Sequence, residues 1–297
     1  MIYSNLGVSA LKVSRIGFGC MSLPPDEKMA IPVLDKAIAL DINYLDTADI
    51  YHDGLNEIII GKAIKGKRDN VIVASKAGNV RNRNGGLDWN PSKKHILKCA
   101  EDSLRRLQTD YIDLYQLHGG TVHDNINESV EAFELLKQQG KIRYYGISSI
   151  RPNVIREYIK RSSIVSVMTQ YSLADRRPEE ETLGLLHKHN IAVMIRGCVA
   201  QGLLIGKPLK PYLDYSSEEV SQMANAVLGL SGTDRTPTQT AIKYVLQNKA
   251  VTSAVVGMRT LEQVEEAVDT VNAPDLSPSE LQSFKNVLKP NVYKEHR

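Results

Sequence analysis

Four side chains that can hold or move a proton follow three successive apolar segments of the chain. Asp46 and Tyr51 lie at and beyond the end of the first segment, Lys76 ends the second, and His118 ends the third. Each residue alone has a structural explanation, such as a turn, a solvated strand end or a buried histidine. Together they indicate one site if the segments are parallel strands, because the carboxyl ends of such strands meet at one edge.

The chemistry that suits this set is the reduction of a carbonyl group. A hydride adds to the carbonyl carbon, and the oxygen then needs a proton. A tyrosine hydroxyl has a reference pKa of about 10, and a neighbouring lysine is expected to lower that pKa. The carboxylate of Asp46 would hold Lys76, and His118 would orient the carbonyl oxygen.

Short β-branched or aromatic runs alternate along the chain with longer stretches of helical period. The strand candidates are Val13–Gly19, Asn43–Thr47, Val71–Lys76, Tyr111–His118, Tyr144–Ser148, Val165–Gln170, Ala192–Arg196 and Ser253–Gly257. Strand–helix alternation predicts a parallel α/β sheet. About eight such units favour a closed (β/α)8 barrel with outer helices, and a doubly wound open sheet is the alternative. No linker divides residues 1–297, so a single domain is expected.

Three helix candidates have readable ends, and they are Asn90–Leu107, Asn127–Gln139 and Thr260–Thr270. Asn90 is expected to cap the first helix, and Thr260 opens the third with the form of a capping box. The stretch 206–235 is long for a connection, which is typical of a binding loop or short helices. The tail after Pro278 is predicted to form one extra C-terminal helix.

The composition excludes several classes of protein. Lys plus Arg is 37 and Asp plus Glu is 34, a net charge of +3 that favours neither a nucleic-acid nor an acidic-membrane partner. No apolar run reaches the about 18 residues of a transmembrane helix, and the first residues do not resemble a signal peptide. The three cysteines are widely spaced, so neither a disulfide framework nor a metal site is expected. A cytoplasmic protein is the prediction.

Two segments resemble the signatures of the aldo-keto reductase family. Leu45–Tyr51 is similar to the family's Asp-Thr-Ala-x-x-Tyr motif, and Thr109–His118 is similar to a second signature that ends in the catalytic histidine. Lys76 stands where the family has its lysine. The resemblance implies a (β/α)8 barrel that reduces an aldehyde or ketone with NADPH, with Asp46, Tyr51, Lys76 and His118 as its catalytic residues.

The resemblance also implies a cofactor site that crosses the mouth of the barrel. Its residues would be Ser148 and Gln170 at the nicotinamide carboxamide, Gly19, Cys20 and Met21 beside the ring, Gly202, Leu203 and Lys207 over the pyrophosphate, Gly257 and Arg259 at the 2′-phosphate, and Gln263 and Glu266 at the adenosine. Arg259 precedes a predicted helix, where an anion is readily bound. A helix cap would also explain Gln263, and a solvated helix face would explain Glu266.

The chain departs from the family pattern at a few positions of this site. Arg196, followed by Gly197, stands where many members have a stacking aromatic residue. A guanidinium can lie flat against a ring, or it can bind substrate or phosphate. Ser149 and Ala267 replace two asparagines that are common in the family.

Two other functions remain open at this point. The barrel could bind NADPH and report redox state with little turnover, or Lys76 could form a Schiff base as in an aldolase. For the reductase, a small-molecule carbonyl substrate and a monomer or weak homo-oligomer are expected. The substrate itself is not specified by these residues.

Overall fold

Eight parallel strands close into a barrel in the computed structural model, which describes residues 1–297. In order around the barrel they are β3 (Ile16–Gly19), β4 (Tyr44–Asp46), β5 (Ile72–Ala77), β8 (Ile112–His118), β9 (Ile142–Ser148), β10 (Ser166–Gln170), β11 (Ala192–Arg196) and β12 (Val251–Val256). Most of their residues are buried, as expected for strands covered on both faces. The predicted (β/α)8 barrel is confirmed, and each of its strands overlaps a predicted one.

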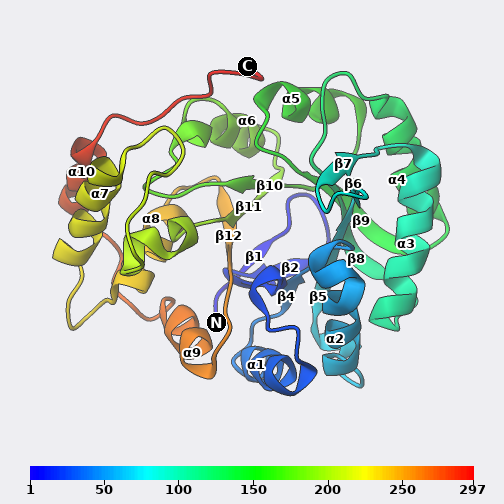
Figure 1. Ribbon diagram of the computed structural model, residues 1–297, viewed down its shortest axis with the longest axis horizontal. Coiled ribbons are helices and arrows are strands. Elements are labelled where there is room, and N and C mark those ends of the chain that lie inside the picture. The colour runs from blue at the N-terminus through cyan, green and yellow to red at the C-terminus, as the bar shows by residue number, and fades with distance from the viewer.

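The helices surround the barrel (Figure 1). They are α1 (Glu27–Ala39), α2 (Leu55–Ala63), α3 (Lys93–Leu107), α4 (Ile126–Gln138), α5 (Pro152–Arg161), α6 (Thr182–Lys188), α7 (Ser217–Gly229), α8 (Pro237–Leu246), α9 (Leu261–Asp269) and α10 (Pro278–Val287). The long stretch after β11 contains α7, and α10 is the extra C-terminal helix predicted after Pro278. None of the helices is long and apolar enough to cross a lipid bilayer.

The first predicted strand, Val13–Gly19, is in fact two strands. Lys12–Ser14 forms β2, which pairs antiparallel with β1 (Tyr3–Asn5) outside the barrel, and only β3 enters the barrel. Leu6, Leu11 and Val13 of this hairpin are buried in one cluster with inward-facing barrel residues such as Tyr44. The hairpin therefore seals one end of the barrel and leaves the other end for a site.

One small antiparallel hairpin and one helix cap also differ from expectation. A hairpin of β6 (Asn79–Arg81) and β7 (Leu87–Trp89) follows β5. Asn90 does not cap α3, because Ser92 accepts the bond from the backbone nitrogen of His95. The Asn90 side chain instead accepts from the backbone of Ser92, which sets the turn before the helix.

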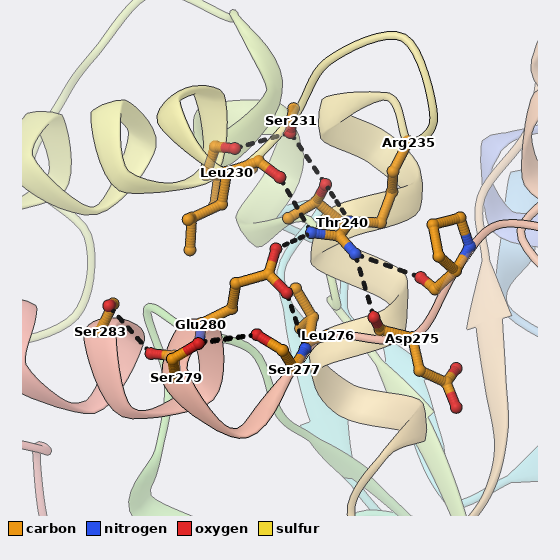
Figure 2. A network of polar contacts seen from close by, with 12 residues as sticks. Leu230, Ser231, Arg235, Thr240, Asp275, Leu276, Ser277, Ser279, Glu280 and Ser283 are labelled. Carbon is orange, nitrogen blue, oxygen red and sulfur yellow. Dashed lines mark hydrogen bonds and ion pairs between the residues drawn. The ribbon is translucent and has the colours of Figure 1, made fainter.

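A buried arginine joins three of the outer elements. Arg235 donates to Leu230 at the end of α7, to Thr240 on α8 and to Glu280 on α10 (Figure 2). It also donates to the carbonyls of Pro274 and Asp275, at 3.2 and 3.3 Å. These contacts fix α10 against α7 and α8.

Candidate active site

Lys76 lies at the centre of a buried polar cluster at the carboxyl ends of β4 and β5. Its Nζ atom donates to Oδ1 of Asp46 at 2.5 Å and to the carbonyl of Thr47 at 2.7 Å. A third, longer contact of 3.5 Å runs to the hydroxyl of Tyr51. Lys76 and Asp46 are 1% and 4% exposed, so the ion pair is shielded from solvent. The structure therefore brings the predicted aspartate, lysine and tyrosine together.

Tyr51 begins a tight turn that follows β4. The next residues, His52 and Asp53, have φ values of 48° and 54°, and Gly54 continues with φ 89°. Left-handed backbone at residues other than glycine costs about 1 kcal/mol or more, so tertiary contacts must hold the turn. Asp53 pairs with Arg81 of β6, and a Cβ at Gly54 would lie 2.8 Å from Arg106. The turn is thus held from two sides.

His118 ends β8 and presents its ring to Tyr51. The two ring centroids are 6.0 Å apart with an edge-on angle of 83°. Burial, together with the nearby charges of Lys76 and Arg196, lowers the pKa of His118 to about 3. The imidazole is therefore neutral at ordinary pH, and its buried Nδ1 atom has no partner. A neutral ring with an unused polar atom can bond to a ligand oxygen.

The protonation states of Tyr51 and Lys76 follow from burial and from each other. Burial raises the pKa of the Tyr51 hydroxyl, and the ammonium of Lys76 lowers it by less, so the net direction is upward. Lys76 lowers the pKa of Tyr51, as the sequence suggested, but the effect of burial is larger. Burial alone would lower the pKa of Lys76, but Asp46 and Tyr51 raise it more. A lysine held as a cation is a poor nucleophile, which argues against the aldolase alternative.

The predicted carboxamide-binding residues line the next strands of the barrel. Ser148 ends β9, and Gln170 ends β10 beside Arg196, the last residue of β11. The guanidinium of Arg196 donates to Oε1 of Gln170 at 2.5 Å. Gly197 follows with φ 75°, and a Cβ there would lie 3.3 Å from the Gln170 side chain. The structure therefore brings Gln170, Arg196 and Gly197 into direct contact.

The predicted phosphate-binding residues follow β11 and β12, which are neighbours in the barrel. Lys207, Arg259 and Arg196 are exposed and have no carboxylate within ion-pair distance. A Cβ at Gly202 would lie 2.6 Å from the Lys207 side chain, and one at Gly257 would lie 2.2 Å from Ser22. Uncompensated cations over a closely packed backbone suit an anionic ligand, so these residues fit a cofactor phosphate.

Other predicted cofactor residues have partners within the protein or are buried. Gln263 accepts from the backbone of Arg259 at 2.8 Å, and Glu266 accepts from the Thr236 hydroxyl at 2.6 Å. Thr260 caps α9, but Gln263 does not return the second bond of a capping box. Leu203 is buried.

The predicted ring-bordering residues after β3 differ in exposure. Cys20 is fully buried, and its carbonyl accepts from Asn56 at 2.8 Å. Met21 is 63% exposed, and Gly19 is partly exposed. The side chain of Cys20 therefore faces the interior, which leaves Gly19 and Met21 as the accessible members of this group.

Several residues that complete the cluster were not predicted from the sequence. Gln116 donates to Oδ2 of Asp46 at 3.3 Å, and Thr47 supplies both the carbonyl for Lys76 and a hydroxyl bond to Asn56. Gln116 precedes His118 by two positions, so the alternation of a strand places both on one face. That spacing was a usable signal for Gln116.

The structure is a (β/α)8 barrel with a lysine-centred polar cluster at the carboxyl ends of its strands. A sequence model described as the Aldo/keto reductase family matches residues 15–289. The chain belongs to the aldo-keto reductase family, and it is accordingly an oxidoreductase of a family that uses a nicotinamide cofactor.

Relatives and solved structures match nearly the whole chain. The Bacillus subtilis protein "Uncharacterized oxidoreductase YqkF" is 49% identical over 99% of this chain and 98% of its own length. The holo form of the aldo-keto reductase AKR11C1 from Bacillus halodurans is 50% identical, with a TM-score of 0.93 over 100% of this chain and 99% of its own. The glycerol dehydrogenase AKR11B4 from Gluconobacter oxydans is 26% identical, with a TM-score of 0.85 over 98% and 97%.

Proposed function

We propose that the protein reduces the carbonyl group of a small aldehyde or ketone with NADPH as the reductant. The observation that carries this proposal is the contact of the Tyr51 hydroxyl with Lys76, itself held by Asp46. When bound, NADPH would supply the hydride that adds to the carbonyl carbon. The resemblance, the exposed cations and the holo form of a 50% identical relative support a nicotinamide cofactor.

Tyr51 is the proposed proton donor. Its raised pKa keeps the hydroxyl protonated at neutral pH, as a donor must be. As the proton leaves Oη, negative charge develops there, and the ammonium of Lys76 stabilises that charge in a site with little water. Asp46 keeps Lys76 charged and aimed, and the neutral His118 would bond to the carbonyl oxygen.

The cofactor would lie across the carboxyl ends of the strands. Gln170 and Ser148 would bind the carboxamide, with Arg196 against the nicotinamide ring. Lys207 and Arg259 would bind phosphate groups, and Gly19, Met21, Gly202, Gly257, Gln263 and Glu266 would line the path. Because Arg259 would meet the 2′-phosphate, preference for NADPH over NADH depends on this residue.

The first experiment is a titration of NADPH and NADH into the purified protein, followed by turnover with a reactive aromatic aldehyde. We expect NADPH to bind more tightly than NADH and to be oxidised only when aldehyde is present. Arg259→Met should weaken NADPH binding about tenfold and leave NADH binding unchanged. Binding without turnover would favour the sensing function, and binding of neither cofactor would contradict the proposal.

A further inference from the structure

The side-chain amide of Gln170 is bonded at both of its ends. Its Nε2 atom donates to Oδ2 of Asp175 at 2.8 Å and to the Tyr212 hydroxyl at 3.0 Å. Its Oε1 atom accepts from Arg196 at 2.5 Å. An amide has one donor end and one acceptor end, so these partners fix which end faces which neighbour.

Asp175 decides the orientation of this amide. It is 0% exposed, and Arg177 donates to both of its oxygens, each at 2.8 Å. A carboxylate in such a bidentate pair can only accept hydrogen bonds, so Gln170 must present its NH2 group to Asp175. The reversed amide would place two oxygens 2.8 Å apart, and would also turn its NH2 group toward the donating Arg196.

The turn that carries Asp175 is held rigidly by the rest of the chain. Ser172 and Asp175 exchange two backbone bonds of 3.1 and 3.0 Å. The ring of Tyr293, in the C-terminal tail, covers the guanidinium of Arg177 with its centroid 5.0 Å from Cζ. The tail thus supports the ion pair that orients Gln170.

We propose that Asp175 is a positioning residue that fixes the acceptor end of Gln170 toward the cofactor, so that the protein selects a pyridine ring bearing a carboxamide NH2 group. This inference rests on the proposed function, because it requires Gln170 to meet the carboxamide of NADPH. Asp175 acts through Gln170 and need not touch the cofactor. Tyr212 contributes to the same orientation as the second acceptor of the Gln170 NH2 group.

The test compares the binding of NADP+ with that of its 3-acetylpyridine analogue, in which an acetyl group without N–H replaces the carboxamide. Dissociation constants from calorimetry need no turnover. The wild-type protein should bind NADP+ about tenfold more tightly, the value of one well-formed hydrogen bond. Asp175→Asn can donate as well as accept, so only Arg196 still disfavours the reversed amide, and the ratio of the two constants should fall to about twofold.

Asp113→Asn is the matched control, because Asp113 is also buried and pairs with Arg68 and Arg143, but at the start of β8. It should keep the tenfold ratio. Tyr212→Phe removes one acceptor and should reduce the ratio to about threefold. If Asp175→Asn does not fold, Tyr212→Phe decides, and an unchanged ratio there overturns the proposal.

The outcomes separate this inference from the proposed function. A ratio that stays near tenfold in folded Asp175→Asn would overturn the role of Asp175. A wild-type protein that binds both compounds equally would also overturn it, and would leave the reductase function standing. Binding of neither compound by the wild-type protein would contradict the proposed function itself.

Discussion

Two of the buried cations in this protein are partnered in opposite ways. Arg235 is 6% exposed, and each of its five N–H groups has an acceptor within the protein. Lys76 is 1% exposed, but one of its three donors reaches only the Tyr51 hydroxyl, at 3.5 Å. A cation whose donors all have acceptors can only hold structure in place. A cation with a loosely held donor can respond when charge develops on its neighbour.

The contrast also appears in the groups around each cation. Glu280, the partner of Arg235, has its pKa lowered by a hydrogen bond from the backbone of Ser277 and by Arg235, as expected for a stable ion pair. The groups around Lys76 do not have all their hydrogen bonds, because Nδ1 of His118 and Oε1 of Gln116 are buried without partners. Such atoms cost stability and are kept where a ligand can complete them.

The largest effect is expected for Lys76→Met. Turnover should fall by about 10³-fold or more, and the stability of the fold should fall by about 3–5 kcal/mol, because Asp46 is left buried without its cation. Kinetics and denaturant unfolding measure the two losses. In the double variant Asp46→Asn/Lys76→Met, stability should recover and activity should not. Recovery of both would contradict the role of Lys76.

Arg235→Met should separate stability from activity. The change removes the arginine donor from Oε1 of Glu280 and from several carbonyls, so the free energy of unfolding should fall by about 3–5 kcal/mol. The kcat of the folded variant, measured well below its melting temperature, should stay within about twofold of the wild type. A large loss of kcat in a folded variant would show that this network reaches the site.

A partly buried carboxyl group, that of Asp49, tests the comparison at a smaller scale. Asp49 lies near Glu57, and burial, with the charge of Glu57, raises its pKa to about 7. Its Oδ1 atom has no partner. Because the folded protein binds this proton more tightly, its stabilising contribution is complete below pH 3.8 and is lost as the pH rises through about 7.

Asp49→Asn should therefore remove this pH dependence. Its free energy of unfolding relative to that of the wild type should increase by about 4 kcal/mol between pH 4 and pH 8. Denaturant unfolding at several pH values gives both curves. Curves that run parallel would mean that Asp49 keeps its ordinary pKa.

The barrel and the lysine-centred cluster were predictable because their signals are local. Each strand is a short apolar run with turns around it, and the strand ends carry Asp46, Lys76 and His118 in order. The division of Val13–Gly19 into two strands was not predicted. An apolar residue such as Val13 fits the hairpin at the end of the barrel as well as it fits a barrel strand, so its type does not distinguish the two. Asn90 and Ser92 are both favourable N-cap residues, and the sequence does not show at which of them the helix begins.

The contacts between distant segments could not be predicted. The amide of Gln170 is bonded to Tyr212, which lies 42 positions away and belongs to no regular element. The net pKa of Tyr51 depends on the burial of its ring, which the sequence does not specify. The roles of Ser148, Arg259, Gln263 and Glu266 toward a cofactor remain predictions.

Tyr51→Phe tests the central claim most directly, because it removes one hydroxyl and leaves the Asp46–Lys76 pair in place. Turnover with NADPH and aldehyde, the dissociation constant for NADPH and the melting temperature are measured on the same preparation. We expect kcat to fall by about 10³-fold, with cofactor binding and melting temperature close to those of the wild type. Turnover within tenfold of the wild type would show that another group donates the proton.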